Sequence, residues 1–162
     1  MQLIGDLGGK KVYYNCAFSI SEAQKTATMP QPYFSCTIFL HRSRWAKQDL
    51  QKFLGHLLKH GCVYLAFHGD GCEAAHDLAD ELSLEMAGEE LPREETAVLT
   101  TWHEDESEED VVAHSLRSAW PAAAYEKQFS SRLFVSIGRT TENDNIKSLL
   151  LEELKEAAGR IR

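Results

Sequence analysis

The chain of 162 residues has the length of one ordinary domain, and its 43% hydrophobic and 26% charged residues are typical of a folded globular protein. Its net charge of −8 argues against nucleic acid as a partner, because an acidic surface repels phosphates. The longest apolar stretches have only the length of strands, so we expect no membrane span, and the first residues lack the basic region and apolar core of a signal peptide.

Cysteine usage indicates a reducing compartment. Cys16, Cys36, Cys62 and Cys72 form no C-x-x-C pair. Cys36 and Cys62 fall within predicted strands, where a free thiol behaves as a small apolar side chain. A chain of this length builds its core without disulfides, so we expect the protein to be cytoplasmic.

The N-terminal part of the chain predicts an edge strand followed by a strand–helix unit. Apolar residues alternate over residues 12–20, which favours a strand at the N-terminal edge of a sheet, with antiparallel pairing as one option. Residues 21–31 read as a polar connection. Residues 33–40 form a continuous apolar strand, Ser43 is a candidate cap for the helix that follows, and Gly61 is the stop of that helix.

The rest of the chain alternates strands and helices. The predicted strands cover residues 62–67, 96–102 and 132–137; the predicted helices cover residues 71–87, a segment from a capping box at Asp105 to Trp120-Pro121, and a segment from Thr140 onward. Four strand–helix units in succession predict an α/β fold: a Rossmann-like three-layer α/β/α sandwich with a mainly parallel sheet of four to five strands. We expect one domain over residues 1–162, in which residues 1–32 supply the edge strand and connection and residues 33–162 the βα repeats.

Three of the predicted strands end on a histidine, namely His41, His68 and His103. In open α/β sheets, ligands collect outside the carboxyl ends of the strands, so these imidazoles mark a candidate pocket. Neutral imidazoles there suit a general base or a metal ligand. No H-x-H or H-E-x-x-H spacing accompanies them, so we predict no metal site. The alternative is that the histidines hydrogen-bond backbone groups at the strand ends.

The turn after the second of these strands contains a glycine pattern. Gly69, Gly71 and Ala74 formally match G-x-G-x-x-[GA]. Asp70 and Glu73 place negative charge where a pyrophosphate would lie, which argues against a dinucleotide. We expect the glycines to permit a tight turn from strand to helix, with the turn still a candidate part of a ligand site.

The same turn offers a thiol. Cys72 lies in the first turn of a predicted helix and His76 follows it by four residues, so a nucleophile–base pair is one interpretation. The acidic neighbours disfavour a thiolate, and a structural role for Cys72 is the alternative.

Two further features belong to the candidate pocket. Arg139 and Thr140 precede the last helix, where free amides and a guanidinium favour an anion, and Arg42 and Arg44 after the first central strand add positive charge. Trp102 is a candidate aromatic wall. The alternative needs no ligand: Thr140 is then an N-cap, Arg139 a surface residue and Trp102 a packing residue.

Charge is distributed unevenly along the chain. Residues 70–110 contain 16 acidic residues and one basic residue, a net charge of −15. A face of this kind attracts a basic protein partner or a cation, and a solvated helix face with an acidic loop is the alternative.

The motifs Phe67-His68-Gly69-Asp70-Gly71 and Thr100-Thr101-Trp102-His103-Glu104-Asp105-Glu106-Ser107 resemble a small uncharacterised bacterial α/β family over about residues 33–116. That family has no assigned activity, so the resemblance implies a fold and no catalytic roles.

Two functions fit these patterns. The first is a non-catalytic regulatory or interaction domain that binds a small anionic ligand at the strand ends. The second is a small hydrolase or transferase acting on a phosphorylated or nucleotide-like substrate, with His68 and His103 as base or metal ligands, Asp70 orienting one of them and Arg139 holding the anion. The sequence names no cofactor. A homodimer is a further option, and an apolar patch on the last helix or on the edge strand near Val12 would indicate one.

Overall fold

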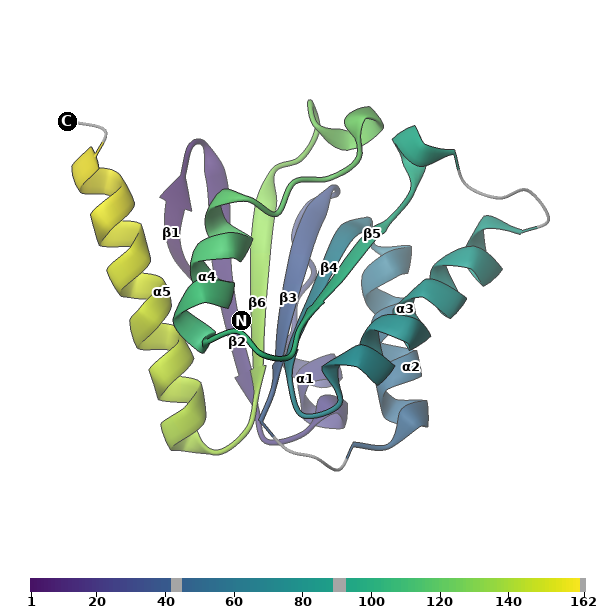
Figure 1. The fold of residues 1–162 in the computed structure, drawn as a ribbon, viewed down its shortest axis with the longest axis horizontal. Helices are drawn as coiled ribbons and strands as arrows, with labels where there is room; N and C mark the ends of the chain where they lie inside the picture. The colour runs from purple at the N-terminus through teal and green to yellow at the C-terminus, as the bar shows by residue number, and fades with distance from the viewer. Residues whose placement is uncertain (42–44, 89–92, 161–162) are drawn as a thin grey trace.

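The computed structural model describes residues 1–41, 45–88 and 93–160 (Figure 1). Six strands and five α-helices follow one another along the chain, with two short 3₁₀ turns at Glu94–Thr96 and Ala123–Tyr125. In chain order these elements are β1 (Gln2–Leu7), β2 (Lys10–Ala17), α1 (Ile20–Thr26), β3 (Phe34–Leu40), α2 (Lys47–Lys59), β4 (Cys62–Gly69), α3 (Cys72–Ala87), β5 (Leu99–His103), α4 (Glu108–Arg117), β6 (Ser131–Ile137) and α5 (Thr140–Arg160).

The strands form a single sheet in the order β1-β2-β6-β3-β4-β5. β1 pairs antiparallel with β2, and all other neighbours are parallel. One core, here called the α1–α3 core, lies between those three helices and one face of the sheet. The α4–α5 core lies on the opposite face (Figure 1). The prediction of a three-layer α/β/α fold with a mainly parallel sheet is therefore confirmed.

The N-terminal region differs in detail from the sequence-based expectation. The antiparallel edge strand is β1, whereas the strand predicted over residues 12–20 is β2, which lies inside the sheet and pairs in parallel with β6. The sheet consequently has six strands instead of four to five. Gly8 and Gly9, with φ angles of +61° and +76°, form the turn between β1 and β2, and the Gly9 amide donates to Asp6 Oδ1.

The prediction of a polar connection over residues 21–31 was wrong for its first half, because this part of the chain forms α1. Ser19 caps this helix by accepting a hydrogen bond from the Glu22 amide, and the Glu22 carboxylate accepts one from the Phe18 amide. Ile20 and Ala23 are buried against the sheet. The short helix is stabilised by its cap and by these two contacts, which a search for long apolar periodicity does not detect.

Two helix starts also differ from the prediction. Ser107, and not Asp105, caps α4: its hydroxyl oxygen accepts from the Asp110 amide. The capping box at Asp105 was therefore wrong by two residues. α2 begins at Lys47 with Ala46 at the N-cap, and the predicted cap Ser43 lies outside the described residues.

The strand order creates a crevice between β3 and β6. The two strands are parallel neighbours, but the chain leaves β3 toward α2 on the α1–α3 face and leaves β6 toward α5 on the opposite face. Connections that diverge in this way define the topological switch point of an open α/β sheet, where ligands bind. The carboxyl ends of these two strands are therefore the first place to look for a site.

Candidate functional site

The three strand-end histidines lie in a row on one face of the sheet. His68 is in register with Phe39 on β3 and with His103 on β5, and register partners share a face. Phe39 belongs to the α4–α5 core, and His41 follows it by two residues on the same side. The sheet therefore places His41, His68 and His103 beneath the start of α4.

The imidazoles do not converge on one point. The Phe39 ring lies between two of them, with centroid distances of 6.2 Å to His41 and 5.7 Å to His68. His103 instead lies 4.9 Å from the ring of His114 on α4. Over residues 1–41, 45–88 and 93–160, no group of three or more histidine, cysteine or acidic side chains is placed to hold a metal ion.

His41 joins the ends of β3 and β6 to α4. Its Nε2 lies 3.1 Å from Ser136 Oγ, and its Nδ1 lies 3.3 Å from Glu108 Oε1. Burial lowers the pKa of His41, and the neighbouring Glu108 and Glu142 carboxylates partly offset this effect. The order Ser–His–Glu resembles a catalytic triad, so the proton positions decide its role.

Asn143 fixes those protons. Its Nδ2 donates to the carbonyl oxygens of Ala17 and Gly138, which leaves Oδ1 facing Ser136 at 2.7 Å as an acceptor. The single hydroxyl proton of Ser136 is therefore directed to Asn143, and Ser136 Oγ accepts from His41 Nε2–H. A serine nucleophile transfers its proton to the histidine instead. Ser136 is also 0% exposed, so the geometry favours a structural interpretation of the Ser136–His41–Glu108 contacts.

The other two histidines also use ring nitrogens for internal contacts. His68 Nδ1 lies 2.7 Å from the carbonyl oxygen of His103, so Nδ1 is the donor in this contact. His103 Nδ1 lies 2.8 Å from Glu106 Oε1, and its Nε2 lies 3.1 Å from Thr101 Oγ1. Within the described part of the chain, Nε2 of His68 has no hydrogen-bond partner.

The glycine turn after β4 contacts the end of β3 and the segment that precedes α2. Gly69 and Gly71 have φ angles of +93° and +73°, and the Asp70 amide between them donates to the Leu40 carbonyl at 2.8 Å. The Trp45 indole donates to the Asp70 carbonyl at 3.2 Å. These contacts give the glycines a structural role in a close backbone approach.

Cys72, at the start of α3, is 1% exposed, and burial raises the pKa of its thiol. A raised pKa keeps sulfur in its protonated form, which is a weak nucleophile. The geometry therefore favours the structural interpretation of this cysteine.

Of the remaining predicted residues, Arg139 follows Ile137, whose carbonyl accepts from the His41 amide, by two residues, whereas Trp102 lies apart from the histidine row. The Arg139 amide donates to Glu142 Oε2 at 2.6 Å, so a carboxylate of the chain itself occupies the start of α5, where the sequence predicted an external anion before Thr140. Trp102 points to the other face of the sheet, where its ring lies 4.5 Å from that of His76 on α3. Arg42 and Arg44 lie outside the described residues.

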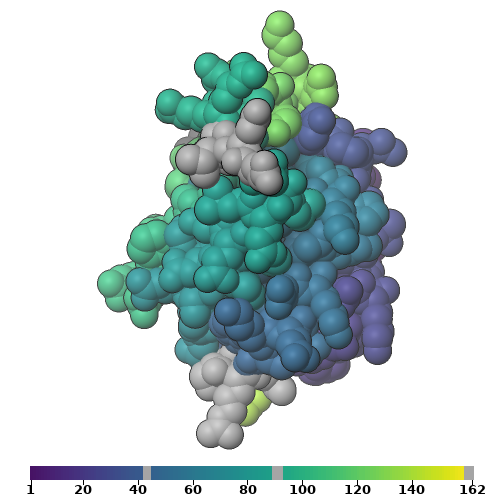
Figure 2. All heavy atoms as spheres, turned by 90° about the vertical axis from the view of Figure 1, so that its right-hand side faces the viewer, coloured from purple at the N-terminus to yellow at the C-terminus, as the bar shows by residue number. Residues whose placement is uncertain are grey.

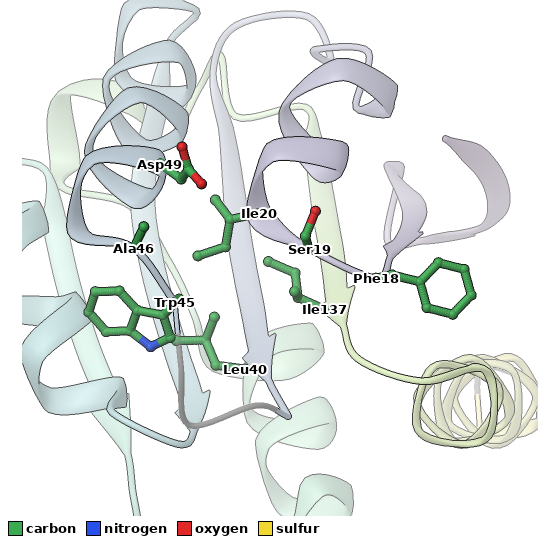
Figure 3. Close-up of a pocket in the computed structure, with 8 residues that line it drawn as sticks. All are labelled: Phe18, Ser19, Ile20, Leu40, Trp45, Ala46, Asp49 and Ile137. Atoms are coloured by element: carbon green, nitrogen blue, oxygen red, sulfur yellow. The ribbon is translucent and has the colours of Figure 1, made fainter.

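Sequence reasoning missed a pocket at the carboxyl ends of β2, β3 and β6. The cavity, here called the switch-point pocket, has a volume of about 160 Å³. Figure 3 shows Trp45 on one side, Ile20, Ile137 and Leu40 near the centre, and the Phe18 ring directed away from the cavity. Its lining residues are Phe18, Ser19, Ile20, Leu40, Trp45, Ala46, Asp49 and Ile137. Leu40 and Ile137 are the last residues of two predicted strands, but only the strand order brings the lining residues together.

The fold and this pocket define a doubly wound α/β/α protein with a cavity at its switch point. Residues 16–153 match the family described as Domain of unknown function (DUF7684), and the chain belongs to that family. No curated protein and no solved structure matches the chain. Within the described part of the chain, no helix combines the length and the apolar character that crossing a bilayer requires.

Proposed function

We propose that this protein is a non-catalytic regulatory domain that binds a small ligand in the switch-point pocket. The observation that carries the proposal is the position of that cavity, at the carboxyl ends of β2, β3 and β6, where open α/β sheets bind their ligands. Ser136 and Cys72 are the nearby side chains that could act as nucleophiles. The Ser136 hydroxyl donates to Asn143 and burial raises the pKa of the Cys72 thiol, so both keep their protons, which supports a non-catalytic role.

The pocket fits a single ring or a branched chain that carries an N–H donor. A cavity of about 150 Å³ takes one benzene molecule, and the volume here is about 160 Å³. Leu40, Ile137 and Trp45 supply apolar walls, while Asp49 is the one charged side chain among the described lining residues. A carboxylate accepts hydrogen bonds from an amine or amide. We therefore propose a neutral or cationic ligand in place of the anionic ligand suggested by the sequence.

Three one-ring probes test both the pocket and the charge: benzylamine, benzyl alcohol and benzoate. We expect benzylamine to shift the NMR signal of the Trp45 indole N–H and to leave that of Trp102, which lies on the edge strand β5 beyond β4, unchanged. Benzoate should bind at least threefold more weakly, because it faces the Asp49 carboxylate. An Ala46→Phe variant fills the cavity and should abolish the shift.

Two results would count against this function. If none of the probes moves the Trp45 signal, the switch-point pocket is not a ligand site. If benzoate binds most tightly, the pocket is a site but its ligand is the anion that the sequence suggested, and the Asp49 argument is wrong.

The same proposal includes a basic protein partner, supported by the surface around Trp102. This tryptophan is 46% exposed although its ring lies 4.5 Å from that of His76. The carboxylates of Asp77 and Asp80 lie 3.1 and 3.7 Å from the nitrogens of that histidine, which places negative charge beside the exposed ring. An arginine side chain stacks on tryptophan and pairs with carboxylates. Figure 2 looks onto the side of the molecule that carries α3.

We also propose that the protein works in a reducing compartment, the cytoplasm. All four cysteines are free, and three of them are buried. Burial raises the pKa of the Cys36 and Cys62 thiols, which suits side chains that stay reduced within a core.

A further inference from the structure

A buried arginine lies at the opposite end of β6 from the switch-point pocket. Arg132 is 3% exposed, and its Nε donates to the Ser115 carbonyl at 3.3 Å near the end of α4. Its Nη1 is buried and has no hydrogen-bond partner. About five residues of β6 separate Arg132 from Ile137, roughly 16 Å along the strand, so the two places are distinct.

Two aromatic rings and a second cation surround this guanidinium. The Arg132 Cζ lies 5.2 Å from the Phe129 ring centroid and 5.6 Å from that of Trp120. Lys10 Nζ lies 5.6 and 5.8 Å from the same two rings and donates to the Phe129 carbonyl. The rings attract both positive charges, but they supply no oxygen acceptor to Nη1.

A second orphan group lies beside the arginine. Ser115 Oγ is buried without a hydrogen-bond partner, on the same residue whose carbonyl accepts from Arg132. Two unsatisfied buried donors on touching residues are unusual, because buried polar groups are normally hydrogen-bonded. Each of the two residues therefore has a buried donor that an acceptor from outside the chain would satisfy.

Among the described residues, no carboxylate forms an ion pair with either of the two cations. Across residues 1–41, 45–88 and 93–160, no acidic oxygen lies within 4.0 Å of Lys10 Nζ or the Arg132 guanidinium. Burial lowers the pKa of Arg132 below its usual value, which reflects the cost of a desolvated charge. Buried charges in proteins are usually paired, so this one lacks the partner that would stabilise it.

We propose that Arg132, Lys10 and Ser115 form a binding site for a small oxyanion: a phosphate, sulfate or carboxylate group. The anion accepts from Arg132 Nη1, from the Lys10 ammonium and from the Ser115 hydroxyl, each of which is a donor suited to it. Trp120, which is 41% exposed, marks the solvent side of the site. This site binds an anion, whereas Asp49 in the switch-point pocket disfavours anions. The two places therefore bind ligands of different charge.

Thermal unfolding in sodium phosphate, in sodium acetate and in sodium chloride of equal ionic strength and pH tests the site. We expect the Tm of the wild type to rise by about 5 °C when phosphate exceeds its Kd a hundredfold, relative to chloride. Stabilisation by phosphate alone assigns a tetrahedral anion, and stabilisation by acetate as well assigns a carboxylate-compatible site; both results support the proposal. Equal Tm values in all three salts overturn it and leave a buried water as the partner of Nη1.

Three variants locate the effect. Arg132→Gln should abolish the phosphate-dependent rise, and Lys10→Gln should weaken phosphate binding about tenfold. Arg139→Gln removes an exposed arginine at the other end of β6 and should keep the full rise. If Arg132→Gln does not fold, Lys10→Gln decides: a rise equal to that of Arg139→Gln overturns the proposal.

Discussion

The imidazole Nε2 of His41 lies 3.1 Å from the hydroxyl oxygen of Ser136, and the two side chains join the carboxyl ends of the neighbouring strands β3 and β6. This contact lies at the carboxyl ends of parallel strands, where α/β enzymes place their catalytic side chains. The direction of the hydrogen bonds favours a different role, because the Ser136 hydroxyl donates its hydrogen bond to Asn143 Oδ1. The pair therefore closes the crevice on the α4–α5 face and leaves the pocket on the other face open.

Ser136→Ala should lower the free energy of unfolding by about 1–3 kcal/mol, because it leaves His41 Nε2 and Asn143 Oδ1 buried without a partner. Urea titration measures the change. Ser148→Ala is the matched control, since Ser148 is an exposed residue of α5, and it should stay within about 0.5 kcal/mol of the wild type. Covalent labelling of Ser136 by a fluorophosphonate, with no loss of stability in the variant, would show a nucleophile instead.

Stability should fall as the pH drops below about 6.5. The folded state lowers the pKa of His41, His56 and His114, chiefly by burial, so the unfolded chain takes up protons that the folded chain resists. Stability is then greatest above the unfolded pKa and decreases toward acid, by at most about 1.4 kcal/mol per pH unit for each histidine. Urea titrations between pH 7.5 and 5 measure this slope.

His41→Gln should flatten that slope, because it removes one of the three contributing groups while a side-chain amide still reaches Ser136. An unchanged slope in the variant would mean that His41 titrates equally in both states. A steeper dependence of stability on pH would mean that folding raises the pKa of His41 instead of lowering it.

Gly69→Ala should destabilise the fold by about 2–5 kcal/mol. The φ angle of Gly69 is +93°, and an added Cβ would lie 2.3 Å from the Leu40 carbonyl oxygen, which is backbone that cannot rotate away. Gly55→Ala is the paired control. Gly55 lies inside α2 with nothing within 4 Å of an added Cβ, so alanine there should stabilise by about 0.5–1 kcal/mol. Similar effects of the two substitutions would contradict the close approach of β4 and β3.

Much of the fold could be predicted from apolar patterning alone. β3 is buried at every residue, and the strands predicted over residues 62–67, 96–102 and 132–137 correspond to β4, β5 and β6. β1 escaped detection because it is an exposed edge with a glycine, Gly5, in its interior.

The candidate site was less predictable, because it depends on which strands are neighbours. The placement of β6 between β2 and β3 creates both the His41–Ser136 pair and the pocket around Trp45, and no local pattern encodes that order. The burial of Arg132 could not be predicted either. An arginine is expected at the surface unless the residues that surround it in the fold are known. Local sequence specifies elements, while the long-range strand pairing specifies sites.

Trp102→Ala should weaken the binding of a basic partner while changing stability by less than about 1 kcal/mol, because the ring is half exposed and contacts mainly His76. A deca-arginine peptide at 50 mM NaCl is a suitable probe, since guanidinium groups stack on tryptophan and pair with carboxylates. We expect Trp102→Ala and Asp77→Asn each to weaken its binding about threefold to tenfold, measured by fluorescence anisotropy of a labelled peptide. Glu152→Gln makes the same charge change on exposed α5 and should have little effect. Equal weakening by all three variants would mean that the peptide responds to net charge alone, and that the exposed ring has no partner of this kind.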